Sequence, residues 1–176
     1  MKIKKIKSLC ESTNIMQLYT ELDSEGEYIG QWIGNGKCRY AVEGLPPVEA
    51  EHICSMFDWG EKRIDKMVIE ESRLPVECDM KYSVTDIPLQ NMGINLVVNG
   101  KEYTVFEEET RVCFVESNLL APVYDEIDKI QIVKRSESVL LVRRGMITIG
   151  MLMPTRLFHK DKVKKILNEM LRFDRV

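Results

Sequence analysis

The chain is poor in the residues on which most enzyme active sites depend. It has two histidines among 176 residues, and they lie far apart in the sequence. None of its serines or cysteines stands in a recognisable nucleophile motif, and no group of side chains has the spacing of metal ligands. The sequence therefore predicts a protein that is not an enzyme and that uses neither a metal nor another cofactor.

Long apolar runs are also missing. The longest, such as Met146 to Pro154, fall far below the roughly 20 residues that span a bilayer. The N-terminus starts with lysines but has no continuous apolar segment and no small-residue cleavage site. The five cysteines form no CxxC pair, which is typical of reduced thiols in a cytoplasm. We therefore expect a cytoplasmic protein with buried, inert cysteines and no membrane contact.

Charge is distributed unevenly along the chain. Residues 1–7 and 154–176 hold 11 of the 25 basic residues and three of the 28 acidic ones. The segment between them, residues 8–153, therefore carries 14 basic against 25 acidic groups, a formal charge of −11. If both ends form helices on one side, the molecule is electrically two-sided. The alternative is that each terminal helix simply has a solvated basic side.

The clearest structural pattern is an antiparallel meander between Asp128 and Pro154. It predicts strands over 130–133, 139–142 and 146–153, separated by the polar turns 136–138 and 143–145. Thr155 can then cap a last helix in which Val163, Ile166, Leu167 and Met170 form an apolar stripe.

The N-terminal part shows similar signals. Residues 2–13 have Ile3, Ile6, Leu9 and Cys10 at the spacing of a basic amphipathic helix, with a strand as the alternative for the first residues. Strands are expected over 15–22, 27–33 and 37–42. Gly30, Gly34 and Gly36 resemble a phosphate-binding loop only superficially, because no Lys-Ser/Thr pair and no helix follow them. We interpret Gly34-Asn35-Gly36 as a tight turn between two strands.

The middle of the chain alternates between clear and irregular patterns. A helix after Pro47 is expected to bury Ala50, Ile53, Cys54 and Phe57, and residues 64–70 form the next strand. Strands over 94–98 and 101–106 meet at Asn99-Gly100, and a further strand covers 111–116. A short helix then places Leu119, Leu120, Val123 and Tyr124 on its apolar side.

These patterns predict an α+β fold with mainly antiparallel sheets, short helices and a C-terminal amphipathic helix. We expect a first α/β unit over 1–72, an irregular connector over 73–93 and a second unit over 94–176, packed as one compact domain. A weak repeat supports two similar units. Residues 39–43 and residues 111–116 are each expected to form a strand that ends in Val-Glu. In both places a short helix follows, and after it comes a second strand that begins with Asp-Lys.

The second unit resembles half of a domain of the bacterial DNA sliding clamp, the β subunit of the replicative polymerase. The resemblance covers Val115-Glu116-Ser117, the helix through Tyr124 and the three strands up to Met153. Met153-Pro154-Thr155-Arg156-Leu157 is similar to the end of some clamps. The chain also resembles uncharacterised prophage proteins of Gram-positive bacteria. A clamp subunit has three domains, so the resemblance implies that several copies of this chain, a homo-oligomer, would be needed to encircle DNA.

Two functional hypotheses follow. The first is a phage or mobile-element accessory of DNA metabolism with a clamp-like fold, which meets double-stranded DNA and replication or recombination proteins. Its DNA-binding residues would be Lys4, Lys5, Lys7, Lys160, Lys162, Lys164, Lys165 and Arg172. The second is a protein-interaction module, such as a phage accessory or inhibitor, that recognises a partner through a strand edge or an apolar pocket and does not bind DNA.

Overall fold

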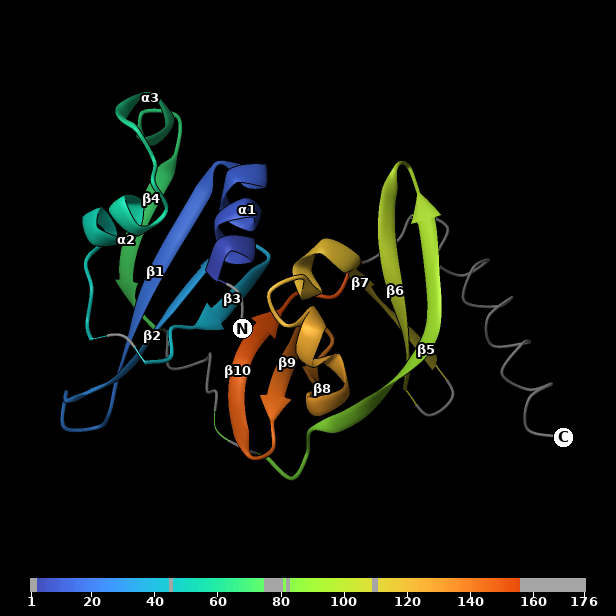
Figure 1. Cartoon of the computed structure of the whole chain (residues 1–176). Coiled ribbons are helices and arrows are strands. Elements are labelled where there is room, and N and C mark those ends of the chain that lie inside the picture. Colours follow the sequence, from blue (N-terminus) through green and yellow to red (C-terminus); the bar gives the residue numbers. More distant parts are fainter. Residues whose placement is uncertain (1–2, 45, 75–80, 82, 109–110, 156–176) are drawn as a thin grey trace, which may run out of the picture.

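The computed structural model describes residues 3–44, 46–74, 81, 83–108 and 111–155, and it has an α+β fold built on one large sheet (Figure 1). The helices are α1 (Ile3–Thr13), α2 (Ala50–Met56) and α3 (Glu61–Ile64), with the 3₁₀ helices η2 (Ser117–Leu120) and η3 (Tyr124–Lys129). The strands are β1 (Ile15–Leu22), β2 (Tyr28–Asn35), β3 (Cys38–Ala41), β4 (Val68–Arg73), β5 (Ile87–Val98), β6 (Lys101–Glu108), β7 (Arg111–Glu116), β8 (Gln131–Ser136), β9 (Val139–Arg144) and β10 (Ile147–Leu152).

Ten described strands form the sheet in the order β4-β1-β2-β3-β10-β9-β8-β5-β6-β7. All neighbours are antiparallel except β1 and β4, which run parallel. The long strand β5 shifts register between Asn91 and Asn95, where Gly93 has a positive φ of 67°. Such a bulge bends a strand, so one end of β5 pairs with β8 and the other with β6.

The main core lies between the helices and one face of the sheet. Helix α1 buries Ile6, Leu9 and Cys10 there, and α2 buries Ile53 and Cys54. Burying each large apolar side chain contributes about 1.5–3 kcal/mol, so α1 is fixed to the sheet mainly by this stripe. The opposite face has its own cluster around Trp32, Val133, Leu141 and Met151.

The tight turns follow the residues that favour them. Asn99 and Gly100 both have positive φ, 51° and 74°, as a type I′ turn between β5 and β6 requires. Asn35 pairs with Cys38 across the β2–β3 turn, and its side-chain oxygen accepts the Lys37 N–H at 2.9 Å. The hairpin predicted at Asn99-Gly100 is confirmed. The predicted hairpin between β2 and β3 also forms, but its turn residues are Gly36 and Lys37 rather than Gly34-Asn35-Gly36, because Gly34 and Asn35 belong to β2 and pair with β3.

Other expectations need correction. Residues 64–70 are not one strand, because Ile64 ends α3 and β4 begins at Val68. Strand β5 begins at Ile87, inside the segment expected to be irregular. The short helix after Ser117 is a pair of 3₁₀ helices, and Tyr124 points into solvent with 63% of its surface exposed.

The predicted repeat has a partial counterpart in the sheet. The order β4-β1-β2-β3 recurs as β8-β5-β6-β7. However, β4 is parallel to β1, whereas β8 is antiparallel to β5. The predicted C-terminal helix lies outside the described residues. Among the described helices, none has both the length and the apolar character to cross a membrane.

Candidate nucleic-acid interface

The three predicted lysines of the N-terminus all lie on α1, but they are not equivalent. Lys4 and Lys5 are exposed on α1, and Lys5 lies on the flank of the helix that borders a groove, whereas Lys7 is half-buried. The Lys7 Nζ atom lies 3.9 Å from Glu11 Oε1, one helical turn further along, so part of its charge is compensated. The predicted residues Lys160, Lys162, Lys164, Lys165 and Arg172 lie outside the described residues.

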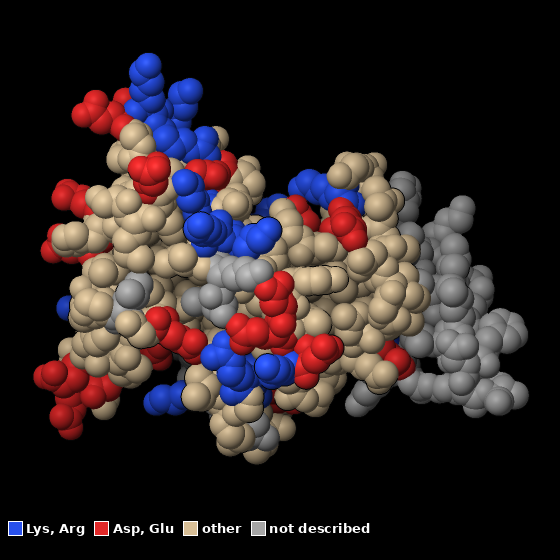
Figure 2. All heavy atoms as spheres, in the orientation of Figure 1, with Lys and Arg blue, Asp and Glu red and all other residues tan. Residues whose placement is uncertain are grey.

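A second group of basic side chains lies beside α1. The Arg63 guanidinium donates a 2.8 Å hydrogen bond to the Glu11 carbonyl oxygen, which holds α3 against the C-terminal end of α1. Lys62 and Lys66 are exposed on this short segment. In Figure 2, Lys and Arg side chains gather over α1 and around α3 on the same side of the molecule. We call Lys4, Lys5, Lys62 and Lys66 the lysine face.

The sequence did not lead us to Lys62 and Lys66. The helix pattern was expected to end at Trp59 and Gly60 and the next strand to cover residues 64–70, so Lys62 had no predicted element and Lys66 was placed on a strand. The run of charged residues Glu61-Lys62-Arg63 could have indicated a short exposed helix, which is what α3 is.

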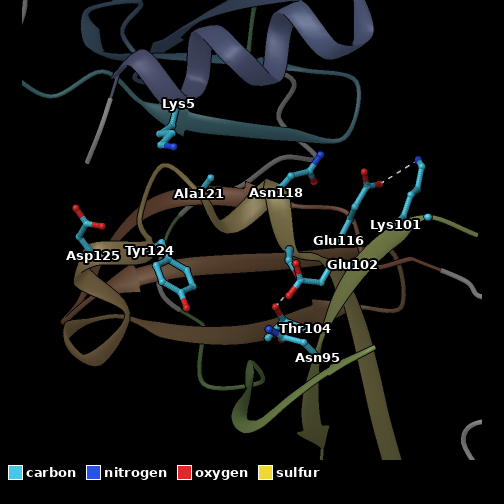
Figure 3. Close-up of a pocket in the computed structure, with 12 residues that line it drawn as sticks. Lys5, Asn95, Lys101, Glu102, Thr104, Glu116, Asn118, Ala121, Tyr124 and Asp125 are labelled. Carbon is cyan, nitrogen blue, oxygen red and sulfur yellow. Dashed lines mark hydrogen bonds and ion pairs between the residues drawn. The ribbon is translucent and has the colours of Figure 1, made fainter. Parts of the chain in front are cut away.

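A groove of about 610 Å³ opens between α1, the β5–β6 hairpin and the 3₁₀ helices (Figure 3). It is lined by Lys5, Asn95, Gly100, Lys101, Glu102, Thr104, Glu116, Ser117, Asn118, Ala121, Tyr124 and Asp125. Lys5 reaches toward the groove from α1, opposite Ala121 and the side on which Tyr124 and Asp125 lie. The lining therefore combines amides, hydroxyls, one exposed aromatic ring and charges of both signs.

The charges in the groove largely compensate one another. Glu116 Oε2 lies 3.2 Å from Lys37 Nζ and 3.5 Å from Lys101 Nζ, so this carboxylate is shared by two lysines. Glu102 and Asp125 add further negative charge at the lining. The lining thus has three acidic side chains against two basic ones, Lys5 and Lys101, so it carries no net positive charge.

Three of the described cysteines offer little nucleophilic chemistry. Burial raises the pKa of Cys10 to about 12 and that of Cys38 to about 12, and burial also raises the pKa of Cys54. These three thiols are buried as predicted, while Cys113 is half-buried and Cys78 lies outside the described residues. Among the described residues, no three His, Cys, Asp or Glu side chains lie close enough together to hold a metal ion.

Similarity to known proteins does not assign this chain to a family. Comparisons with protein-family models, with curated proteins and with solved structures find no match. The features that bear on function are therefore the lysine face, the groove and the arrangement of the strands.

Proposed function

We propose that this chain is a non-enzymatic accessory protein of DNA metabolism, of the phage or mobile-element kind, that contacts double-stranded DNA through the lysine face. The observation that carries the proposal is the placement of Lys4 and Lys5. They stand on the exposed side of a helix whose other side is buried against the sheet, so their positions relative to the fold are fixed. Lysines on a fixed surface attract phosphates without reading the base sequence.

The succession of elements supports the clamp-like part of the proposal. Helix α1 is followed by the meander β1-β2-β3, and η2–η3 are followed by the meander β8-β9-β10. The two meanders meet through the antiparallel pair β3–β10, which gives the order β1-β2-β3-β10-β9-β8. Ile6 of α1 and Leu119 of η2 belong to the same core cluster, so both helical segments cover one face of the sheet. A homo-oligomeric ring with its helices toward DNA is the corresponding assembly.

Negative charge limits where DNA can lie. Asp125 and Asp128 are exposed on η3, and Figure 2 shows Asp and Glu side chains gathered below the lysine face. Phosphates would be repelled there. The proposed contact is therefore confined to the side formed by α1 and α3, with the predicted C-terminal residues as its extension.

Fluorescence anisotropy with a labelled duplex of random sequence tests this proposal. Four phosphate contacts give a slope of log K against log salt of about −4. Reversing two charges, in the double variant Lys4→Glu/Lys5→Glu, should weaken binding at least about tenfold at low salt and reduce the slope by about 2.

The matched control is the double variant Lys81→Glu/Lys129→Glu, which changes the net charge equally at two exposed positions outside the lysine face. It should bind DNA nearly as well as the wild type. Failure of the wild-type chain to bind at low salt would exclude DNA contact, and equal losses in both double variants would exclude the lysine face as the site.

A further inference from the structure

Strand β4 forms one end of the sheet, and its outer edge has hydrogen-bonding groups that no other described strand uses. The Val68 N–H donates to the Asn14 carbonyl at 2.8 Å, and the Leu74 N–H donates to the Thr20 carbonyl at 2.8 Å. In a parallel pair the residues bonded to the neighbour alternate with residues that face away. The N–H and C=O groups of Ile69, Glu71 and Arg73 therefore point outward.

An apolar pocket lies directly beside this edge. It has a volume of about 300 Å³ and lies between α2, α3 and β4. Its apolar lining is Ala50, Cys54, Trp59, Ile64 and Ile69. Ile69 is thus both a pocket residue and a member of the outward-facing set on β4. A strand added to β4 would direct every second side chain toward the pocket.

The charged side chain that lines the pocket is acidic. It is Glu51, and the exposed Glu71 lies on the same face of β4 as the pocket residue Ile69. The Glu71 carboxylate also accepts the Ala50 N–H, which places its negative charge between β4 and the start of α2. A bound segment with Lys or Arg next to its apolar residue would complement these carboxylates.

We propose that the outer edge of β4 binds an extended, basic segment of a partner protein by strand addition, with one apolar side chain of that segment in the pocket between α2, α3 and β4. Main-chain hydrogen bonds to Ile69, Glu71 and Arg73 would supply general affinity, and the pocket and its carboxylates would supply selectivity. The site shares no residue with the lysine face, so strand addition can be tested independently of DNA binding.

Selection of a phage-displayed library of random linear peptides on the immobilised full-length chain tests this proposal. The enriched peptides should alternate apolar residues with Lys or Arg, and their binding can be measured by anisotropy with synthetic labelled copies. Arg73→Pro removes one outward N–H and should weaken binding at least about tenfold, because proline is tolerated on a strand edge but cannot donate. Arg73→Ala keeps the N–H and should change binding less than about twofold.

The pocket has its own matched pair of variants. Ser55 lines the pocket, so Ser55→Phe should fill it and weaken binding about tenfold, whereas Met56→Phe places the same ring at an exposed position of α2 outside the lining and should have little effect. Failure to enrich basic, alternating peptides would overturn the proposal, as would unchanged binding to either Arg73→Pro or Ser55→Phe. If the chain self-associates in sedimentation and Arg73→Pro dissociates it, the occupant is a second copy and the partner segment is excluded.

Discussion

The ring of Tyr40 on β3 packs against the backbone of Gly150 on β10, its partner in the antiparallel ladder. A Cβ atom at position 150 would lie 2.8 Å from both Cδ1 and Cε1 of this ring and 3.3 Å from Val142 Cβ. Tyr40 is fully buried, and its hydroxyl donates to the Leu119 carbonyl oxygen, so the ring has little room to move. Strands β3 and β10, which join the two meanders, can therefore pack this closely only because position 150 is a glycine.

Gly150→Ala should therefore destabilise the fold. Overpacking of a filled core costs about 1–3 kcal/mol, and urea denaturation monitored by circular dichroism would measure the loss. Gly30→Ala is the matched control, because an added Cβ there meets nothing within 4 Å although Gly30 also lies in a strand. A stability loss of equal size in both variants would contradict the proposed packing against Tyr40.

Gly34, near the end of β2, and Gly36, in the β2–β3 turn, should respond very differently to substitution. A Cβ at Gly34 would lie 1.9 Å from the Cys38 carbonyl oxygen, which is backbone and cannot swing away. A Cβ at Gly36 meets nothing within 4 Å. Gly34→Ala should cost about 3 kcal/mol or more, whereas Gly36→Ala should be neutral or slightly stabilising. Thermal unfolding of the two variants decides this, and similar melting temperatures would contradict the close approach at Gly34.

Thiol reactivity should follow burial. With pKa values of about 12, Cys10 and Cys38 are almost entirely protonated at pH 8, and the thiolate is the nucleophile. Iodoacetamide should label both far more slowly than the half-buried Cys113 in the native protein. Mass spectrometry of peptides from native and urea-unfolded samples gives the rates, and the difference should disappear in urea. Rapid native labelling of Cys10 would show that α1 opens readily.

Local patterns in the sequence predicted the elements that depend on near neighbours. The stripe Ile6, Leu9 and Cys10 identified α1 and its buried side, and Asn99-Gly100 identified a hairpin because positive φ is a local requirement. Periodicity was misleading at Tyr124, because the segment is 3₁₀ rather than α-helical and the ring points to solvent.

Features that join distant segments could not be predicted in this way. The parallel pairing of β4 with β1 links residues 53 positions apart, and nothing in residues 68–73 specifies that neighbour. The groove is assembled from α1, the β5–β6 hairpin and η2–η3, so its lining residues form no continuous motif. Of the lysine face, only Lys4 and Lys5 were predicted, because they belong to the amphipathic pattern of α1. Lys62 and Lys66 were not predicted.

The ion cluster around Asp86 should control stability in acid. The side chains of Asp86 and Arg143 are 1% and 3% exposed and form an ion pair, and Arg135 also contacts the Asp86 carboxylate. Burial by itself raises the pKa of Asp86, but the hydrogen bonds and charges of Arg135 and Arg143 outweigh it, and the pKa is lowered. The ion pairs of Asp86 therefore add their full free energy to folding at pH values above the ordinary carboxyl pKa of about 4. This stabilisation is lost as the pH falls through the lowered pKa of Asp86.

Asp86→Asn should therefore destabilise the protein by about 3 kcal/mol near neutral pH, because it leaves two arginines without their buried counter-ion. The stability difference between wild type and variant should stay constant from about pH 7 to pH 5 and shrink below about pH 4. Urea denaturation at several pH values measures this difference. Asp128→Asn, at an exposed position on η3, is the matched control and should change little. A difference that grew on acidification would mean that Asp86 is protonated in the folded protein and that the ion pairs do not stabilise it.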